Sequence, residues 1–186
     1  MLGTDDMRQR VYIDTNILGL VFDTTVAQDV AEAIGELCDF ESLEFVTSRK
    51  TLQEILNHGA LEKRCLLKLI YRFMSKLPET NLVGFVPALF GAVMFGEATF
   101  AGGAKRTDAI FSNLKQLFDS DDAEHIFQAV RGQCQFFLTL DSRTILERAR
   151  RYQQQLTTIC PDLRFVAPRE LVSILRNENQ TTVDSP

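Results

Sequence analysis

The chain has 186 residues, of which 45% are hydrophobic and 24% charged, and its net charge is −5. This length suffices for one sizeable core and is too short for two ordinary domains. The acidic balance argues against a protein that coats nucleic acid through bulk charge. No apolar run reaches the roughly 18 residues needed to span a bilayer. The polar N-terminus does not resemble a signal peptide, so the expected location is the cytoplasm, with no membrane partner.

The N-terminal part alternates predicted strands and helices, ending at Pro78. Ser48 is expected to cap the helix that carries Glu54. In chain order the elements are a strand over 10–14, a short helix over 17–22, a helix over 25–39, a strand over 43–46, a helix from Ser48, and a long helix over 61–77.

The C-terminal part continues this alternation after an irregular stretch rich in glycine. Gly132 is expected to end a helix, and the run 136–140 has the continuous apolar character of a strand buried on both faces. In chain order the elements are a strand or loop over 82–86, a helix over 87–95, amphipathic helices over 105–118 and 123–131, a strand over 136–140, a charged helix over 142–155, a strand over 163–166, and a helix over 168–175.

This order of elements predicts an α/β fold with a mostly parallel sheet of four to five strands. Residues 1–8 form an N-terminal extension, and 9–176 form a single domain. Within it, 78–118 is a helical insertion or lid, whose apolar part 85–100 is either an interface or ordinary core. The polar tail 177–186 is expected to be disordered.

Four acidic residues sit on or directly after predicted hydrophobic elements. Asp14 and Asp141 end apolar strands, Glu54 lies on a helix, and Asp122 opens another helix. Open α/β sheets place their ligand sites just past the carboxyl ends of the strands. Carboxylates gathered there repel one another unless a hard cation joins them, so the pattern predicts an Mg²⁺ or Mn²⁺ site. As alternatives, the three aspartates are helix caps and the glutamate is a surface residue.

Other polar and sulfur-containing residues are assigned more modest roles. The four cysteines are expected to be small core residues rather than metal ligands or disulfides. Candidate phosphate-binding patches, each with a solvated helix face as its alternative, are Arg49-Lys50, Lys63-Arg64, Lys105-Arg106 and Arg148 with Arg150-Arg151.

Motifs around the four acids resemble those of the PIN domain family. The segment Val11-Tyr12-Ile13-Asp14-Thr15-Asn16-Ile17-Leu18 resembles the opening of a PIN domain. The segments 47–56, 122–126 and 138–141 resemble its second, third and fourth acidic motifs, in the same order. The chain is longer than the compact toxins of this family, mainly within 78–118. Asp121 and Asp122 are adjacent, so either is a candidate third acid, and alignment on the following residues favours Asp122.

The resemblance implies a three-layer α/β/α fold and an RNA-cleaving enzyme that uses Mg²⁺ or Mn²⁺. It assigns catalytic and metal-binding roles to Asp14, Glu54, Asp122 and Asp141. Many members of the family are the toxins of bacterial toxin–antitoxin pairs, which implies an antitoxin-like protein partner and a homodimer.

Residues next to the acids are candidates for supporting roles. Thr15, Asn16 and Thr139 are expected to hydrogen-bond carboxylates or metal-bound water. Arg143 is a candidate contact for substrate phosphate. His125, three residues after Asp122, is expected to be a satisfied structural histidine rather than a ligand.

Two other functions compete with the metal-dependent endoribonuclease. One is a catalytically silent PIN fold that binds RNA or protein, and the presence of all four acids argues against it. The other is a phosphatase of the haloacid dehalogenase type. That mechanism requires a second acid two residues after Asp14, where this chain has Asn16.

Overall fold

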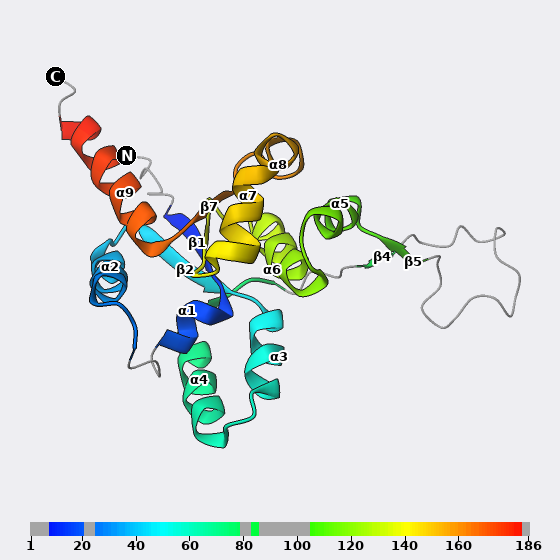
Figure 1. Ribbon diagram of the computed structural model, residues 1–186, viewed down its shortest axis with the longest axis horizontal. Helices are drawn as coiled ribbons and strands as arrows, with labels where there is room; N and C mark the ends of the chain where they lie inside the picture. Colours follow the sequence, from blue (N-terminus) through cyan, green and yellow to red (C-terminus); the bar gives the residue numbers. More distant parts are fainter. Residues whose placement is uncertain (1–7, 21–24, 79–82, 86–104, 184–186) are drawn as a thin grey trace, which may run out of the picture.

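The computed structural model describes residues 8–20, 25–78, 83–85 and 105–183 (Figure 1). At its centre is a sheet of five parallel strands in the order β3-β2-β1-β6-β7. The strands are β1 (Gln9–Ile13), β2 (Leu43–Thr47), β3 (Ser75–Lys76), β6 (Phe136–Leu138) and β7 (Arg164–Val166). The predicted α/β fold with a mostly parallel sheet of four to five strands is therefore confirmed.

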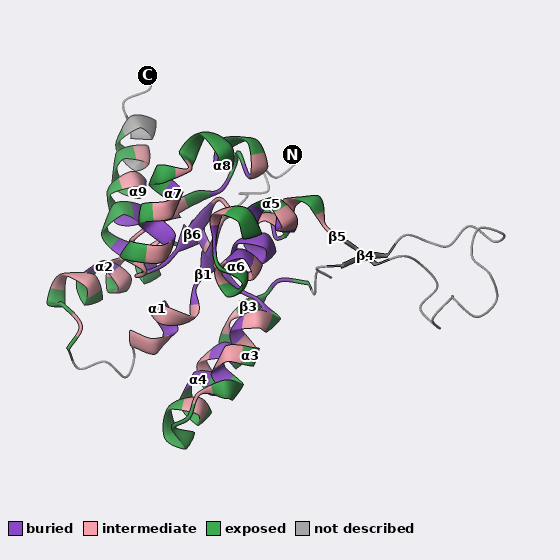
Figure 2. Ribbon diagram, turned by 45° about the vertical axis from the view of Figure 1, so that its right-hand side comes forward, coloured by how far each residue is buried: buried purple, intermediate pink, exposed green. Residues whose placement is uncertain are grey.

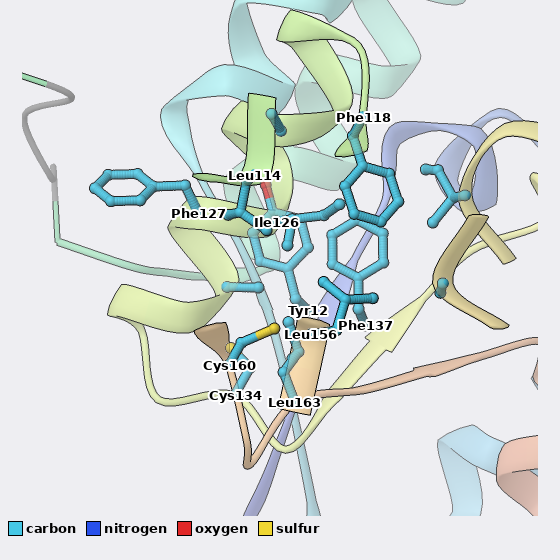
Figure 3. Packing of buried hydrophobic residues seen from close by; sticks show 14 of the residues in the cluster. Tyr12, Leu114, Phe118, Ile126, Phe127, Cys134, Phe137, Leu156, Cys160 and Leu163 are labelled. Atoms are coloured by element: carbon cyan, nitrogen blue, oxygen red, sulfur yellow. The ribbon is translucent and has the colours of Figure 1, made fainter. Parts of the chain in front are cut away.

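Successive side chains of a strand point to opposite sides of the sheet. Both faces of this sheet are buried, each in its own hydrophobic cluster. In the central pair, Tyr12 lies opposite Phe137, and their rings stack with centroids 5.3 Å apart. Both belong to one hydrophobic cluster (Figure 3), whereas their neighbours Val11 and Phe136 belong to a second. Figure 2 shows the buried residues concentrated on the strands and on the inward faces of the helices.

Helices cover the two faces as separate layers. The cluster around Tyr12 includes residues of α5 (Ala109–Leu117), α6 (Ser120–Arg131), α7 (Glu147–Arg151) and α8 (Gln153–Ile159). The other cluster includes residues of α1 (Thr15–Gly19), α2 (Gln28–Asp39), α3 (Arg49–Asn57), α4 (Leu61–Phe73) and α9 (Pro168–Val183). The architecture is thus three layers, with the sheet between two sets of helices.

Strand β3 was not predicted. The sequence predicted one helix over 61–77, whereas α4 ends at Phe73. Met74 adopts an extended conformation, and Ser75–Lys76 pairs with the end of β2. Both strand residues are exposed and polar, so this edge strand carries none of the alternation that marks a half-buried strand. Leu77, which follows the strand, is buried.

The segment 78–118 contains an antiparallel pair, β4 (Val83–Phe85) with β5 (Lys105–Thr107), set apart from the central sheet in Figure 1. The helix expected over 105–118 begins only at Ala109, where Asp108 caps it by accepting a hydrogen bond from the Ile110 N–H at 2.8 Å. The helix predicted over 87–95 lies outside the described residues, as does all of the apolar stretch 85–100 except its first residue.

Three other predicted features differ at the C-terminal end or in the cysteines. The helix predicted over 142–155 is divided into a π-helical turn, η2 (Ser142–Leu146), followed by α7 and α8. Helix α9 continues to Val183, so most of the tail predicted as disordered is helical. Cys134 and Cys160 are buried as expected, but Cys38 and Cys65 are exposed, and all four are free thiols.

Gly132 ends α6 as predicted. The next residue, Gln133, has a φ of 55°, the left-handed conformation that commonly terminates helices. Of the helices in the described ranges, none has the length and apolar character to cross a membrane.

Candidate active site

Asp14 follows β1 directly, at the carboxyl edge of the sheet. Its backbone N–H continues the ladder to β6 by donating to the Leu138 carbonyl at 3.1 Å. The side chain is only 7% exposed, and its Oδ2 accepts hydrogen bonds from Asn16 Nδ2 at 2.7 Å and Thr139 Oγ1 at 2.6 Å. The carboxylate also accepts a hydrogen bond from the Thr15 backbone N–H, and within the described residues no side chain donates to Oδ1.

Asn16 and Thr139 join the ends of the two central strands. Asn16 Nδ2 also donates to Thr139 Oγ1 at 2.9 Å, and Asn16 Oδ1 accepts from the Leu140 N–H at 3.1 Å. Thr139 is fully buried and accepts a further bond from the Asp141 N–H at 3.0 Å. These bonds tie the backbone that leads to Asp141 to the position of Asp14.

Glu54 projects from α3 and has both carboxylate oxygens hydrogen-bonded. Thr15 Oγ1 donates to Oε2 at 2.5 Å, and His125 Nε2 lies 2.8 Å from Oε1. His125 belongs to α6 and is 3% exposed. Because Thr15 is the neighbour of Asp14, this bond holds the glutamate close to the end of β1.

Ser48 does not cap α3 with its side chain, contrary to expectation. Its hydroxyl instead lies 2.7 Å from the Tyr12 hydroxyl, which in turn lies 2.8 Å from His125 Nδ1. Burial gives a physical reason: Ser48 is 2% exposed and Tyr12 is fully buried, so the phenol needs a partner inside the protein.

Asp122, rather than Asp121, faces the other acids. It lies in the first turn of α6, is half-buried, and accepts no hydrogen bond from the described residues. Burial and the charges of Asp14, Asp141 and Asp119 raise its pKa from 3.8 to about 6. The side chain of Asp121 is 79% exposed and forms an ion pair with Lys50 at 2.6 Å, which lowers its pKa.

Asp141 caps the turn that follows β6. Its Oδ1 accepts from the backbone N–H groups of Arg143 at 3.1 Å and Thr144 at 2.7 Å, and its Oδ2 accepts from Thr144 Oγ1 at 2.5 Å. Burial pushes its pKa upward, but the bonds from Thr144 and the neighbouring backbone outweigh burial and hold the pKa below its usual value. The cap interpretation of this residue is therefore structurally correct, and it does not preclude contact with a ligand.

The four acids influence one another electrostatically and divide into two kinds. Burial raises the pKa of Asp14, and the nearby Glu54 charge adds to that effect. Burial also opposes ionisation of Glu54, but the bond and charge of His125 outweigh burial and lower its pKa. The pKa values of Glu54 and Asp141 are thus lowered by their hydrogen bonds, whereas burial and neighbouring charges raise those of Asp14 and Asp122.

The donor chemistry fits a hard cation, since all four acids offer oxygen atoms. Within the described part of the chain, no three His, Cys, Asp or Glu side chains are already gathered into a metal-binding group. The open oxygens of Asp14 and Asp122 are the best candidates for direct contact with a cation. Glu54 and Asp141 have both carboxylate oxygens engaged in hydrogen bonds.

Lys50 is the most enclosed cation near the acids. Its side chain is 11% exposed, so the alternative of a solvated helix face does not hold for this residue. Its ammonium lies 2.6 Å from Asp121 and 3.3 Å from Glu124, joining α3 to α6. Arg143 is exposed, and its guanidinium has no ion pair within the described residues.

Several of these contacts had only weak signals in the sequence. Thr144 lies three residues after Asp141, the spacing at which a capping acid meets the first turn of a helix. Lys50 lies four residues before Glu54, on the same helix face. No local pattern links Tyr12 to His125, which are 113 positions apart.

A cavity formed by described residues lies elsewhere. Its volume is about 960 Å³, and it opens at the amino edge of the sheet, beside Gln9 and Gln135. None of the four acids lines it. Its lining includes two buried thiols and no cluster of acids, so the carboxylates at the opposite edge remain the better candidate for chemistry.

Comparison with protein-family models finds none that matches this chain, and a search of curated proteins also finds no match. The resemblance to PIN domains therefore rests on the residues of the chain alone.

Proposed function

We propose that this chain is a metal-dependent endoribonuclease of the PIN type, which hydrolyses RNA phosphodiester bonds with Mg²⁺ or Mn²⁺. The observation that carries the proposal is the pair Asp14 and Asp122. They come from different elements and repel each other at the carboxyl edge of the parallel sheet. No described residue donates to Asp122, and no described side chain donates to Asp14 Oδ1. Such crowded carboxylates are the usual setting for a hard cation.

When bound, the cation would neutralise charge on the phosphate and supply an activated water. Asp14 and Asp122 would hold it most directly, with Asp141 and Glu54 completing the set. Glu54 is kept in one orientation by Thr15 and His125, and Asp141 by Thr144. Asn16 and Thr139 hold Asp14 Oδ2 in place. Arg143 is exposed beside Asp141 and is proposed to contact substrate phosphate.

The test is cleavage of single-stranded RNA by the full chain with Mn²⁺, Mg²⁺ or EDTA. Asp14→Asn and Asp122→Asn should each lower the rate at least about 100-fold, because even residues around a metal site commonly cost about 10–100-fold. Asp121→Asn is the matched control and should lie within about threefold of wild type, since its side chain points to solvent and Lys50. Cleavage that survives Asp14→Asn would overturn the proposed site.

A catalytically silent PIN fold that binds RNA or protein is the second candidate. One observation favours it: Glu54 and Asp141 use both of their oxygens in internal hydrogen bonds, and the described residues contain no ready metal-binding group. This function predicts RNA or protein binding without Mn²⁺-dependent cleavage. The phosphatase alternative gains no support, because Asn16 stands at the required position and is engaged with Asp14 and Thr139.

The remaining proposals concern the setting of the enzyme. We place it in the cytoplasm as a homodimer, and propose that it is the toxin of a toxin–antitoxin pair whose small partner covers the acidic edge. The resemblance to the PIN family supports these proposals. Induced expression of the wild type should stop bacterial growth, and Asp14→Asn should relieve the arrest; equal toxicity of both would contradict the toxin proposal. Light scattering of the purified chain should give a mass near twice 21.1 kDa if the dimer forms.

A further inference from the structure

A continuous chain of hydrogen bonds runs from the protein interior to Glu54. It begins at Ser48 Oγ, 2.7 Å from the Tyr12 hydroxyl, and continues over 2.8 Å to His125 Nδ1. The other ring nitrogen, Nε2, lies 2.8 Å from Glu54 Oε1. The three inner residues are almost completely buried, so water does not compete for these bonds.

For a neutral imidazole, the chemistry of the groups gives the chain of hydrogen bonds one direction. The ionised Glu54 carboxylate can only accept, so the proton must sit on His125 Nε2. Nδ1 then accepts from the Tyr12 hydroxyl, which remains protonated because burial raises the pKa of Tyr12. Ser48 supplies the hydrogen that the Tyr12 oxygen accepts. Every donor and acceptor in the chain is satisfied, and fully satisfied buried networks hold their members in one arrangement.

The imidazole is also held by its packing. Its ring meets the Tyr12 ring edge-on, with centroids 5.9 Å apart, and Tyr12 stacks on Phe137 in the central strand. His125 lies three residues after Asp122 on α6, whereas Glu54 lies on α3. The bond between His125 and Glu54 therefore connects the helices that carry two of the four acids, as Lys50 does at a second point.

We propose that His125 is a positioning residue for Glu54. It holds Oε1 so that Oε2 stays against Thr15, next to Asp14, and it keeps α3 and α6 in register at the acidic edge. Tyr12 and Ser48 act through it by fixing the position of its proton. The inference rests on the proposed nuclease function, because its consequence is measured in the cleavage rate.

The kinetic test compares variants that keep or remove the N–H donor. His125→Leu removes it and should lower kcat about 10–100-fold, while the KM for RNA changes less than about threefold, because Glu54 is expected to act on the reaction rather than on substrate affinity. His125→Gln places an amide N–H near the same point, and its kcat should be at least about tenfold higher than that of His125→Leu. His58→Leu alters the other histidine and is the matched control, expected to behave as wild type.

Tyr12→Phe is the second variant, needed in case His125→Leu fails to fold. It removes a single oxygen from a buried ring and should lower kcat with KM maintained. A ¹⁵N spectrum of the ring nitrogens gives a readout independent of activity, and only two histidines contribute to it. His125 should show the Nε2–H tautomer, and Glu54→Gln should shift its Nε2 resonance.

The outcomes separate this inference from the function on which it rests. A wild type that cleaves no RNA with Mn²⁺ overturns the proposed function and the inference with it. An active wild type whose His125→Leu variant keeps its kcat overturns the positioning role alone. A spectrum with the proton on Nδ1, or no rescue by His125→Gln of a folded protein, also overturns it.

Discussion

Replacing Asp122 with asparagine should stabilise the metal-free protein while abolishing activity. Asp122 is half-buried next to Asp14 and Asp141, and its pKa is raised from 3.8 to about 6. The folded state therefore resists its ionisation more than the unfolded state does. Asparagine has nearly the same shape and no charge, so it removes the repulsion without creating a cavity.

The sign follows from proton linkage. Between pH 3.8 and about 6 the folded protein holds the Asp122 proton more tightly, so stability falls as pH rises through this window. The penalty is absent below pH 3.8 and complete above about 6. The corresponding free energy is about 3 kcal/mol, which solvent screening at a half-exposed group reduces to about 1–2 kcal/mol. The anion gains about 0.5 kcal/mol from the N-terminus of α6, which lowers the benefit without reversing it.

The assay is urea unfolding in EDTA at pH 7.5 and pH 4. Asp122→Asn should be more stable than wild type by about 1 kcal/mol at pH 7.5, with the difference shrinking toward zero at pH 4. Asp121→Asn is the matched control with the opposite sign, because Lys50 lowers the pKa of Asp121 and the charge is favourable. Mn²⁺ should stabilise the wild type and leave Asp122→Asn almost unaffected.

Two results would refute this reasoning. If Asp122→Asn were less stable than wild type in EDTA at pH 7.5, Asp122 would not be a strained anion in the folded protein. If the variant gained equally at both pH values, the gain would have a cause other than charge.

Three further substitutions test the local structure by urea unfolding. Gln133→Gly should stabilise the protein by up to about 1 kcal/mol, since glycine adopts the left-handed conformation without strain; an equal gain from Gln133→Ala would contradict this. Asp108→Ala should cost about 1 kcal/mol by removing the cap of α5, whereas Asp119→Ala, at a helix start without such a bond, should cost less. Thr144→Val should cost about 1 kcal/mol and raise the pKa of Asp141, followed by carboxyl ¹³C shifts; an unchanged pKa would show that the Thr144 hydroxyl does not stabilise the anion.

The sequence was sufficient for the core of the fold where a segment carried a strong local pattern. Residues 11–13 of β1 and all of β6 are hydrophobic and buried, which is the mark of strands covered on both faces. In a parallel sheet such strands end at one edge, so the sequence alone placed Asp14 and Asp141 at that edge. The edge strand β3 escaped prediction because its two exposed residues have no pattern of burial to detect.

The packed structure decided the details of the candidate site. Asp121 and Asp122 are adjacent aspartates that the sequence does not distinguish. Only the orientation of α6 turns one toward Lys50 and the other toward Asp14. His125 could be recognised as buried, but its contacts with Tyr12 and Glu54 join three separate elements.

Local patterns report which side of an element is buried, because burial depends on the periodicity of that element. They do not report which polar atoms meet across the core. The sequence by itself therefore determined the layers, the central strands and the four candidate acids. Tertiary packing determined which carboxylate oxygens are tied and which stay open, because hydrogen bonds between distant segments exist only once the chain has folded.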